Sequence, residues 1–478
     1  MNRYLRHFVL LSAAALAACV AASAAAAAPF RPAVGTIPFV RVSPKAVQQA
    51  PVCPNGLVCY TPALLKQAYD FPNDRKAPTG AGQTIVIVTA FGSAPVGADI
   101  TSDLAQFDAE NALPDPQFAI WPQQKHVSDD GSTDEQTIFQ WGIETSLDVE
   151  YAHATAPGAK IVLAIADTDD PANVIEVEKE ALAANPGAIV TQSFGGDEAG
   201  DFGPDAATLQ AFQSIYLRQV LTGGTIVASS GDFGATSASI AIGNPDPQPV
   251  AEFPASSPFV LAVGGTMGYP DPFGLLQKGR YGAEQVWNEV LPTAAGASGG
   301  GPSTLFPAPP WQLGLTGTAM RAEPDVSYNA ANDGGAIVVF GGLHGVVGGT
   351  SAAAPQWAGI VALANELRGR QGKPGLGLAT PQLYAIARDK HAYRDDFHDI
   401  TIGSNAIFGP DSGLFGYTAK PGYDFPTGLG TPDVSSLLKD LSGRENFNSR
   451  FQDLLAFLTG RSNGHGGKGP GKLFRPGG

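Results

Sequence analysis

The segment Gly348-Gly349-Thr350-Ser351, followed by Ala352-Ala353-Ala354-Pro355, combines residue types that suit a catalytic nucleophile. Glycines let the backbone approach a substrate closely, and the alanines predict a helix that begins at the serine. A hydroxyl at that position lies beside the free amides of a helix N-terminus, which can stabilise an oxyanion. A serine that only caps a buried helix has the same pattern. The segment therefore predicts catalysis only if another part of the chain supplies a base.

Two acidic residues, Glu144 and Asp148, lie four positions apart in a segment with helical periodicity. On a helix this spacing places both carboxyls on one face, one turn apart. If both are buried they share a proton, and one pKa rises toward that of a base that works in mild acid. A solvated helix face would show the same spacing. The neighbouring Ile143 and Leu147 favour the buried alternative.

A third carboxyl, Asp232, lies between glycines directly after the apolar run at residues 225–229. A carboxyl that follows a buried strand lies at the carboxyl edge of a parallel sheet, where α/β proteins form ligand sites. An Asx turn would also account for an isolated Gly-Asp pair.

These residues must be positioned by strands and helices that alternate along the chain. Continuous β-branched runs predict buried strands at residues 84–90, 160–166, 187–192 and 225–229. Helical patterns cover residues 63–69, 98–111, 170–184, 206–222 and 358–367. The alternation predicts an α/β fold with a central, mostly parallel sheet covered by helices on both faces. A further helix, from residue 435, is expected to lead out of the domain.

Composition narrows the class of protein. The 478 residues include 59 glycines and 39 prolines, and only 15% are charged, which is typical of loop-rich secreted proteins. The net charge of −15 argues against nucleic acid as a partner. After the amino-terminal region, no segment is long and apolar enough to predict a membrane span.

Residues 1–28 have the pattern of an export signal. Arg3 and Arg6 precede an apolar run, and Ala26-Ala27-Ala28 is a small-residue cleavage site. The tetrapeptide that ends at Cys19 also resembles a lipoprotein cleavage box, in which Cys19 becomes the lipidated first residue. We expect a secreted or periplasmic protein, with a lipid anchor at Cys19 as the alternative.

The segments on either side of the main domain have distinct compositions. Residues 29–59 are rich in proline and valine and predict an extended arm or a short propeptide. Cys53 and Cys59 are expected to close a small disulfide loop there. Residues 443–478 predict an amphipathic helix over 447–458, followed by a Gly-rich disordered tail.

Between these segments, residues 60–442 resemble the sedolisins, serine-carboxyl peptidases with a subtilisin-like, three-layer α/β fold. No single motif is specific, but their order along the chain is. The motifs are Tyr60-Thr61-Pro62, Glu144 and Asp148 with Ala156-Pro157-Gly158-Ala159, Ser193 with Gly195, Ser229-Ser230-Gly231-Asp232, Phe253-Pro254-Ala255-Ser256-Ser257-Pro258, Ser298-Gly299-Gly300-Gly301, Pro324-Asp325-Val326-Ser327 and Gly349-Thr350-Ser351. The resemblance implies a monomeric endopeptidase that acts on proteins or peptides.

The resemblance also implies a role for each acidic candidate. Ser351 would attack the peptide carbonyl to form an acyl-enzyme, and Glu144 would act as general base and then general acid. Asp148 would orient Glu144 and tune its acidity. Asp232 would line the oxyanion hole, where it must be protonated to donate a hydrogen bond. Activity is therefore expected in acid.

One calcium ion is implied by the same resemblance. Its ligands would be the carboxylates of Asp399 and Asp424 and the backbone carbonyls of Ile400, Lys420 and Gly422. Such hard oxygen donors suit calcium. Lys420 stands where a glycine is more usual in the family. Without the resemblance, these residues predict only Gly/Asp turns.

The chain departs from the family at its amino-terminal side. Sedolisins usually carry a long prodomain that assists folding and blocks the site, whereas only residues 29–59 separate the predicted signal from the domain. We expect this arm either to act as a short propeptide or to remain attached through its disulfide loop.

Two rival functions predict different features. A subtilisin-type protease needs a histidine base and an aspartate on the first strand, but residues 84–90 contain no aspartate. His153 and His344 are the plausible bases, and both are expected to form structural hydrogen bonds instead. An inactive peptidase-fold binding protein predicts loss of a catalytic residue, yet all four expected residues are present.

Overall fold

The computed structural model describes residues 28–32, 53, 56–121, 134–203, 205–236, 249–292 and 294–444. The predicted signal apart from Ala28, the alternative at Cys19, the helix over 447–458 and the Gly-rich tail lie outside these ranges.

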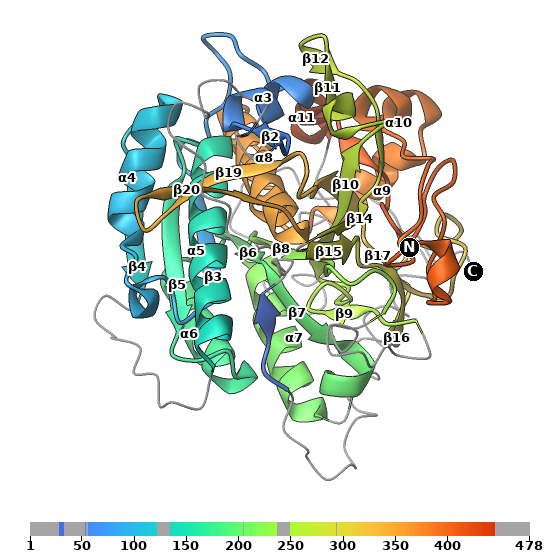
Figure 1. Cartoon of the computed structure of the whole chain (residues 1–478), viewed down its shortest axis with the longest axis horizontal. Helices are drawn as coiled ribbons and strands as arrows, with labels where there is room; N and C mark the ends of the chain where they lie inside the picture. Colours follow the sequence, from blue (N-terminus) through green and yellow to red (C-terminus); the bar gives the residue numbers. More distant parts are fainter. Residues whose placement is uncertain are drawn as a thin grey trace, which may run out of the picture.

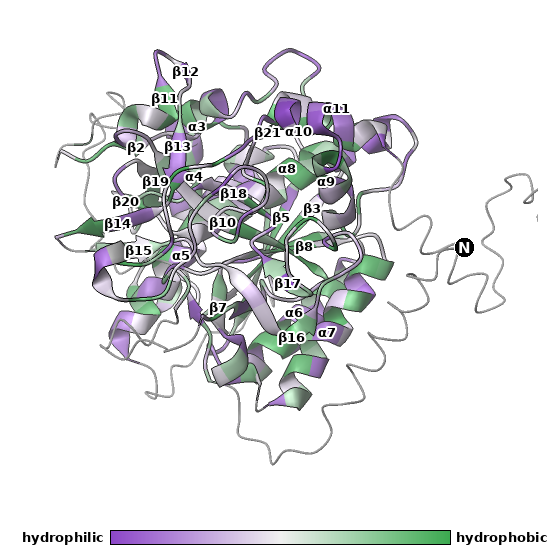
Figure 2. Cartoon of the chain, turned by 90° about the vertical axis from the view of Figure 1, so that its right-hand side faces the viewer, coloured by the Kyte–Doolittle hydropathy of each residue, from purple (hydrophilic) through white to green (hydrophobic). Residues whose placement is uncertain are grey.

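A central sheet of eight strands confirms the predicted architecture. Its order is β13–β10–β8–β6–β3–β5–β4, and β18 also pairs with β10. Every pairing is parallel except that of β10 with β13. The strands are β3 (Thr84–Ala90), β4 (Gln117–Trp121), β5 (Lys160–Ala166), β6 (Ile189–Gln192), β8 (Thr225–Ser229), β10 (Val260–Gly268), β13 (Glu284–Val286) and β18 (Val326–Asn329). In Figure 2 the strands around β3 and β8 are largely green, because both of their faces are buried.

Helices cover both faces of this sheet (Figure 1). One face packs against α6 (Pro171–Ala184) and α7 (Ala206–Leu221), and the other against α5 (Glu135–Thr155) and α8 (Thr350–Arg370). The remaining helices are α3 (Pro62–Ala68), α4 (Ile100–Asn111), α9 (Thr380–Ala387), α10 (Lys390–Asp396) and α11 (Val434–Gly443). No helix in the described ranges has both the length and the apolar composition needed to cross a bilayer.

Short sheets surround the central one. They are β1 (Arg31–Pro32), β7 (Phe194–Asp197) and β9 (Glu252–Phe253); β2 (Cys59–Tyr60), β19 (Gly335–Phe340) and β20 (Leu343–Val347); β11 (Leu276–Gln277) with β12 (Arg280–Tyr281); β14 (Asn288–Leu291) with β15 (Ala294–Ala297); β16 (Gly301–Pro307) with β17 (Met320–Glu323); and β21 (Phe397–His398) with β22 (Thr431–Pro432).

The expectation that the last predicted helix leads out of the domain is wrong. α11 packs against α8 and buries an apolar face formed by Val434, Leu437, Leu438 and Leu441. This spacing of three and four residues places all four side chains on one side of a helix. The helix therefore belongs to the core of the domain.

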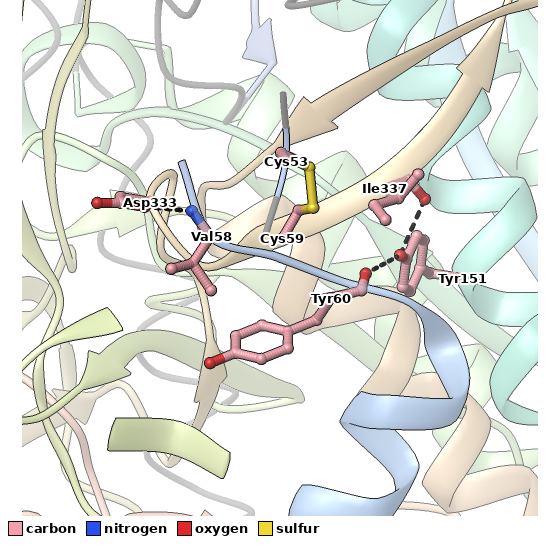
Figure 3. The surroundings of a disulfide bond; sticks show 7 residues. All are labelled: Cys53, Val58, Cys59, Tyr60, Tyr151, Asp333 and Ile337. Atoms are coloured by element: carbon pink, nitrogen blue, oxygen red, sulfur yellow. Dashed lines mark hydrogen bonds between the residues drawn. A yellow bond between two sulfur atoms is a disulfide. The ribbon is translucent and has the colours of Figure 1, made fainter. Parts of the chain in front are cut away.

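The amino-terminal arm is joined to the domain at two places. The expected disulfide between Cys53 and Cys59 is present, and β2 beside it pairs in parallel with β19 (Figure 3). The hydroxyl of Tyr151, on α5, lies 2.9 Å from the carbonyl oxygen of Ile337 and 3.4 Å from that of Tyr60. The second attachment is β1, which pairs with β7. Parts of the arm therefore belong to the folded core.

Candidate active site

Helix α5 carries the first two acidic candidates through the interior. The side chain of Asp134 caps its first turn by accepting the Thr137 N–H at 2.9 Å. Every residue from 141 to 155 is buried, because α5 lies between the sheet, α4 and α8. The side chains of Glu144 and Asp148 therefore form a buried pair, and the solvated-face alternative is excluded.

Helix α8 presents Ser351 to this pair. Gly349 precedes the helix with φ of 97°, a left-handed conformation that favours glycine. A Cβ on Gly348 would lie 2.2 Å from Asn332 Oδ1, so the preceding glycine is also required. In the resulting geometry Ser351 Oγ donates a hydrogen bond of 2.9 Å to Glu144 Oε2. The nucleophile candidate and the base candidate, 207 positions apart in sequence, are thus in contact.

Asp232 lies in the loop after β8, at the edge predicted from the sequence. Its Oδ1 accepts two hydrogen bonds from Thr350, one from the backbone N–H and one from the hydroxyl, both of 2.8 Å. The Thr350 hydroxyl in turn accepts the Gly231 N–H at 3.2 Å. Because Oδ1 already accepts two hydrogen bonds, a proton on this carboxyl belongs on Oδ2. Asp232 is thereby fixed to the residue that precedes Ser351.

The three carboxyls influence one another electrostatically. Burial raises the pKa of Glu144 well above its usual value, and the charges of Asp148 and Asp232 raise it further. Burial also raises the pKa of Asp148. Glu144 Oε1 and Asp148 Oδ2 are buried without a hydrogen-bond partner among the described residues. A proton shared between the two carboxyls would give both oxygens a partner, which leaves the pair with one negative charge.

Ser193 is a residue whose importance the sequence did not reveal. Its hydroxyl donates a 2.6 Å hydrogen bond to Asp148 Oδ1, and its carbonyl oxygen lies 3.5 Å from Ser351 Oγ. The hydrogen bond lowers the pKa of Asp148, against the larger effect of burial. Ser193 stood among the sequence motifs without a role, because a contact across 45 positions has no local signal.

Neither His153 nor His344 is the group that contacts Ser351 Oγ. His153 Nε2 lies 3.1 Å from the carbonyl oxygen of Pro114, and His344 Nε2 contacts Glu110. Ser351 Oγ instead contacts Glu144 and Ser193, so the predicted structural roles of both histidines are confirmed. The geometry contradicts the subtilisin-type alternative, since the group beside the serine is a carboxyl.

The candidate calcium ligands come together in two loops. Backbone N–H groups of one loop donate to both carboxylates: Lys420 N to Asp424 Oδ2 at 3.0 Å, and Gly422 N to Asp399 Oδ2 at 2.9 Å. No described residue donates a hydrogen bond to the carbonyl oxygens of Ile400, Lys420 or Gly422. Two carboxylates and three carbonyl groups without a donor among the described residues are the kind of oxygen ligands that a hard cation prefers. The described residues contain no group of three His, Cys, Asp or Glu side chains suited to a metal.

Known proteins resemble this chain in both sequence and structure. Kumamolisin from a Bacillus species is 36% identical over 394 residues, which cover 80% of this chain. Sedolisin from a Pseudomonas species is 31% identical over 365 residues, which cover 76% of this chain. The solved Pseudomonas sedolisin, described as a serine-carboxyl proteinase complexed with two molecules of pseudo-iodotyrostatin, matches with a TM-score of 0.67 and 29% identity. That match covers 81% of this chain and 99% of the solved chain. The chain belongs to the sedolisin family.

The sequence match covers only part of the length of these relatives. The chain spans 63% of the length of kumamolisin and 58% of that of Pseudomonas sedolisin. No family model matches it. The sedolisin fold and the cluster of Glu144, Asp148, Asp232 and Ser351 rest on residues that the structure describes.

Proposed function

We propose that this protein hydrolyses peptide bonds in proteins as an acid-acting serine-carboxyl endopeptidase. Ser351 Oγ attacks the peptide carbonyl, and its proton passes along the existing hydrogen bond to Glu144 Oε2. Glu144 then protonates the leaving amine, which leaves an acyl-enzyme on Ser351. Water attacks this ester with the same residue acting again as base. Asp148, which shares a proton with Glu144, keeps one negative charge available on the pair.

The tetrahedral oxyanion requires donors on its other side. We assign this role to Asp232 Oδ2, protonated, and to the backbone N–H of Ser351. The Thr350 bonds to Oδ1 support the assignment, because they leave Oδ2 to carry the proton. The pair on α5 must be ionised once while Asp232 stays protonated, and these conditions hold together only in acid.

The observation that carries the proposal is the 2.9 Å contact of Ser351 Oγ with the buried Glu144 carboxyl. A pH–rate profile on a denatured protein substrate tests it. We expect hydrolysis that persists well below pH 6, where a histidine base loses activity. Activity confined to neutral and alkaline pH would refute the carboxyl base. Absence of hydrolysis at every pH would favour the inactive binding protein.

The hydrogen bond from Ser193 to Asp148 predicts a shift in the acid limb of that profile. Ser193→Ala removes a donor that favours the ionised carboxyl, so the pKa of Asp148 rises and the acid limb moves to higher pH. We expect kcat to fall about 10-fold at the low-pH end, in line with a hydrogen bond to a charged group. The matched control is Ser256→Ala, which removes a buried hydroxyl without a partner among the described residues. Equal shifts in the two variants would contradict the role of Ser193.

Buried carboxyls away from the site support action in acid. Glu178 on α6 is fully buried, accepts a 3.0 Å hydrogen bond from Gln192, and burial raises its pKa to about 8. In the unfolded chain a glutamate has a pKa of about 4.3. Between this value and the folded pKa of about 8, Glu178 is protonated in the folded protein and ionised in the unfolded chain. Its contribution to stability is present below pH ~4 and is lost as the pH rises toward ~8.

Glu178→Gln is therefore expected to weaken the pH dependence of stability. Relative to the wild type, the free energy of unfolding of the variant should be higher by on the order of a few kcal/mol at pH 7.5 and nearly unchanged at pH 4. Urea unfolding at the two pH values measures the difference. Glu176→Gln, an exposed change on the same helix, is the matched control. A variant with the same free energy of unfolding as the wild type at both pH values would contradict the raised pKa of Glu178.

We further propose that the loops around Asp399 and Asp424 bind one calcium ion. The two carboxylates and the carbonyls of Ile400, Lys420 and Gly422 would hold it, and the bound ion would neutralise the two negative charges and stabilise the loops. The carbonyl of Lys420 supplies the same ligand atom as a glycine would, so the lysine is compatible with the site.

Chelation is expected to lower stability through this site. At a calcium concentration of about 100 Kd, binding contributes about 2.7 kcal/mol, so EGTA should lower the melting temperature by several degrees. Asp424→Asn should remove most of this response. Asp411→Asn, an exposed change at a position between the two loops in sequence, should retain it. Melting curves that coincide with and without calcium would refute the site.

We also propose that the protein is exported and acts as a monomer on protein or peptide substrates. Mass spectrometry of the mature protein distinguishes cleavage after Ala28 from lipidation at Cys19. Size-exclusion chromatography with light scattering tests the monomer.

A further inference from the structure

The strand β7 connects the candidate active site to the amino-terminal arm. It begins directly after Ser193, whose carbonyl oxygen lies 3.5 Å from Ser351 Oγ. One edge of β7 pairs with β9, and the other edge pairs with β1. Figure 1 shows the dark blue strand of the arm beside β7. The edge of β7 that is not paired with β9 is thus occupied by the chain itself.

The direction of β1 matches that of a substrate approaching the nucleophile. Because the pairing is antiparallel, Arg31 lies opposite Gly195 and Pro32 lies opposite Phe194. The arm therefore runs toward Ser193 and Ser351 in the amino-to-carboxyl direction. In a substrate, the residues that precede the scissile bond run toward the nucleophile in this same direction. An extended peptide that adds a strand to β7 would occupy the place of β1.

Phe30 anchors the arm in an aromatic pocket beside β7. Its side chain is fully buried, and its ring centroid lies 4.6 Å from that of Phe194, 5.2 Å from Phe202 and 5.5 Å from Phe212. The backbone N–H of Phe30 also donates a 2.9 Å hydrogen bond to the carbonyl of Asp169. Burial of a phenylalanine in an aromatic cluster is among the largest stabilisations that one side chain provides.

The nucleophile is covered in this arrangement. Ser351 exposes none of its surface, and Glu144 exposes 1%. A substrate carbonyl therefore reaches Ser351 Oγ only after a segment that covers this atom moves. β1 is a candidate for that segment, because it pairs with β7, the strand that begins directly after Ser193. A short two-residue strand anchored mainly by one side chain is easier to displace than a strand of the central sheet.

We propose that Phe30, Arg31 and Pro32 occupy the acyl-side substrate groove as a self-ligand, with Phe30 filling a subsite for an aromatic substrate side chain. The inference rests on the proposed peptidase function. The arm competes with substrates for the edge of β7. Good substrates carry a large aromatic residue at the position that replaces Phe30, two residues before the one opposite Phe194.

A binding experiment tests this inference without turnover. The probe is the blocked synthetic peptide Ala-Pro-Phe-Arg-Pro, the sequence of residues 28–32, titrated against the full chain with Ser351→Ala, which cannot process itself. Adding Phe30→Ala should vacate the subsite and lower the Kd of the peptide at least about 10-fold, since a buried aromatic anchor is lost. A peptide with alanine at its third position should bind neither protein.

Controls separate displacement of the arm from general destabilisation. Phe273→Ala removes an aromatic side chain that is 40% exposed and should leave the Kd unchanged. Phe30→Leu preserves apolar burial, so it keeps the test valid if the alanine variant does not fold, and it should give a smaller shift. In the active chain, Phe30→Ala should lower KM for substrates with phenylalanine at the matching position.

The outcomes distinguish this inference from the proposed function. An unchanged Kd in both Phe30 variants, or a lower melting temperature without altered peptide binding, would show that β1 is a permanent structural strand and would overturn the inference. A tighter Kd in a chain without hydrolytic activity would uphold the groove while refuting the peptidase. Hydrolysis with unchanged peptide binding would support the proposed peptidase function and overturn the inference about the groove.

Discussion

Ser351→Ala is expected to preserve the fold and to lower kcat on peptide substrates by about 10⁵-fold or more, the size of effect that follows loss of a catalytic nucleophile. The helix start depends on Gly349, and the alanines that follow favour the helix in either variant. The change leaves Glu144 Oε2 without its donor, at a cost of about 1–3 kcal/mol. Circular dichroism and peptide binding should therefore remain close to those of the wild type while turnover is lost.

Two further variants make this expectation specific. Ser146→Ala, on α5 between the two acidic residues, removes a buried hydroxyl without a partner among the described residues and should remain active. Glu144→Ala should be as inactive as Ser351→Ala, and the double variant should lose no more than the worse single variant, because residues that act as a unit are not additive. Additive losses, or a comparable kcat in either single variant, would refute the assignment of nucleophile and base.

The strands of the sheet were the part of the fold that could be predicted best. The observed bounds of β3, β5 and β8 coincide with the predicted ones, because each is a β-branched run buried on both faces. β4 was not predicted, since Gln117–Trp121 lies at the edge of the sheet and is only partly buried. The pairing of β18 with β10 was also beyond local patterns, as it joins residues about sixty positions apart.

For the candidate active-site residues, the sequence predicts which residue types are involved but not which of them are in contact. The spacing of Glu144 and Asp148 predicts a common helix face, but a buried pair and a solvated pair have the same spacing. What decides between them is the packing of α8 against α5, a contact between distant segments. Ser193 and Thr350 hold Asp148 and Asp232 through hydrogen bonds across 45 and 118 positions, and a serine or threonine in a loop carries no sign of such a partner.

The arm shows why composition alone is a poor guide to position. Residues 29–59 have the proline content of an extended segment, and an extended segment was predicted. An extended conformation is also what a strand pairing with β7 requires, and in this segment Phe30 and Pro32 are buried while Pro29 and Arg31 are exposed. The position of Phe30 among Phe194, Phe202 and Phe212 depends on elements that lie far along the chain.

Replacement of Asp232 is expected to separate charge from hydrogen bonding in the oxyanion hole. Asp232→Ala removes the donor and should lower kcat by about 10²–10³-fold at every pH, as loss of one oxyanion donor does. Asp232→Asn can keep its carbonyl oxygen on the two donors of Thr350 and present its N–H₂ group in place of the protonated Oδ2. The asparagine variant should therefore retain far more activity than the alanine variant.

The shape of the pH profile then identifies the group on its alkaline limb. In the wild type we expect activity to fall as Asp232 loses its proton, whereas the asparagine amide donates at any pH, so Asp232→Asn should extend activity to higher pH. The acid limb should stay in place, because Asp232 is protonated and uncharged in the pH range where that limb lies, and its charge raises the pKa of Glu144 only at higher pH. Profiles of kcat for the wild type and both variants measure these shifts. If the alkaline limb stays in place in Asp232→Asn, the proton that controls it belongs to another group, and Asp232 does not act as the acidic donor to the oxyanion.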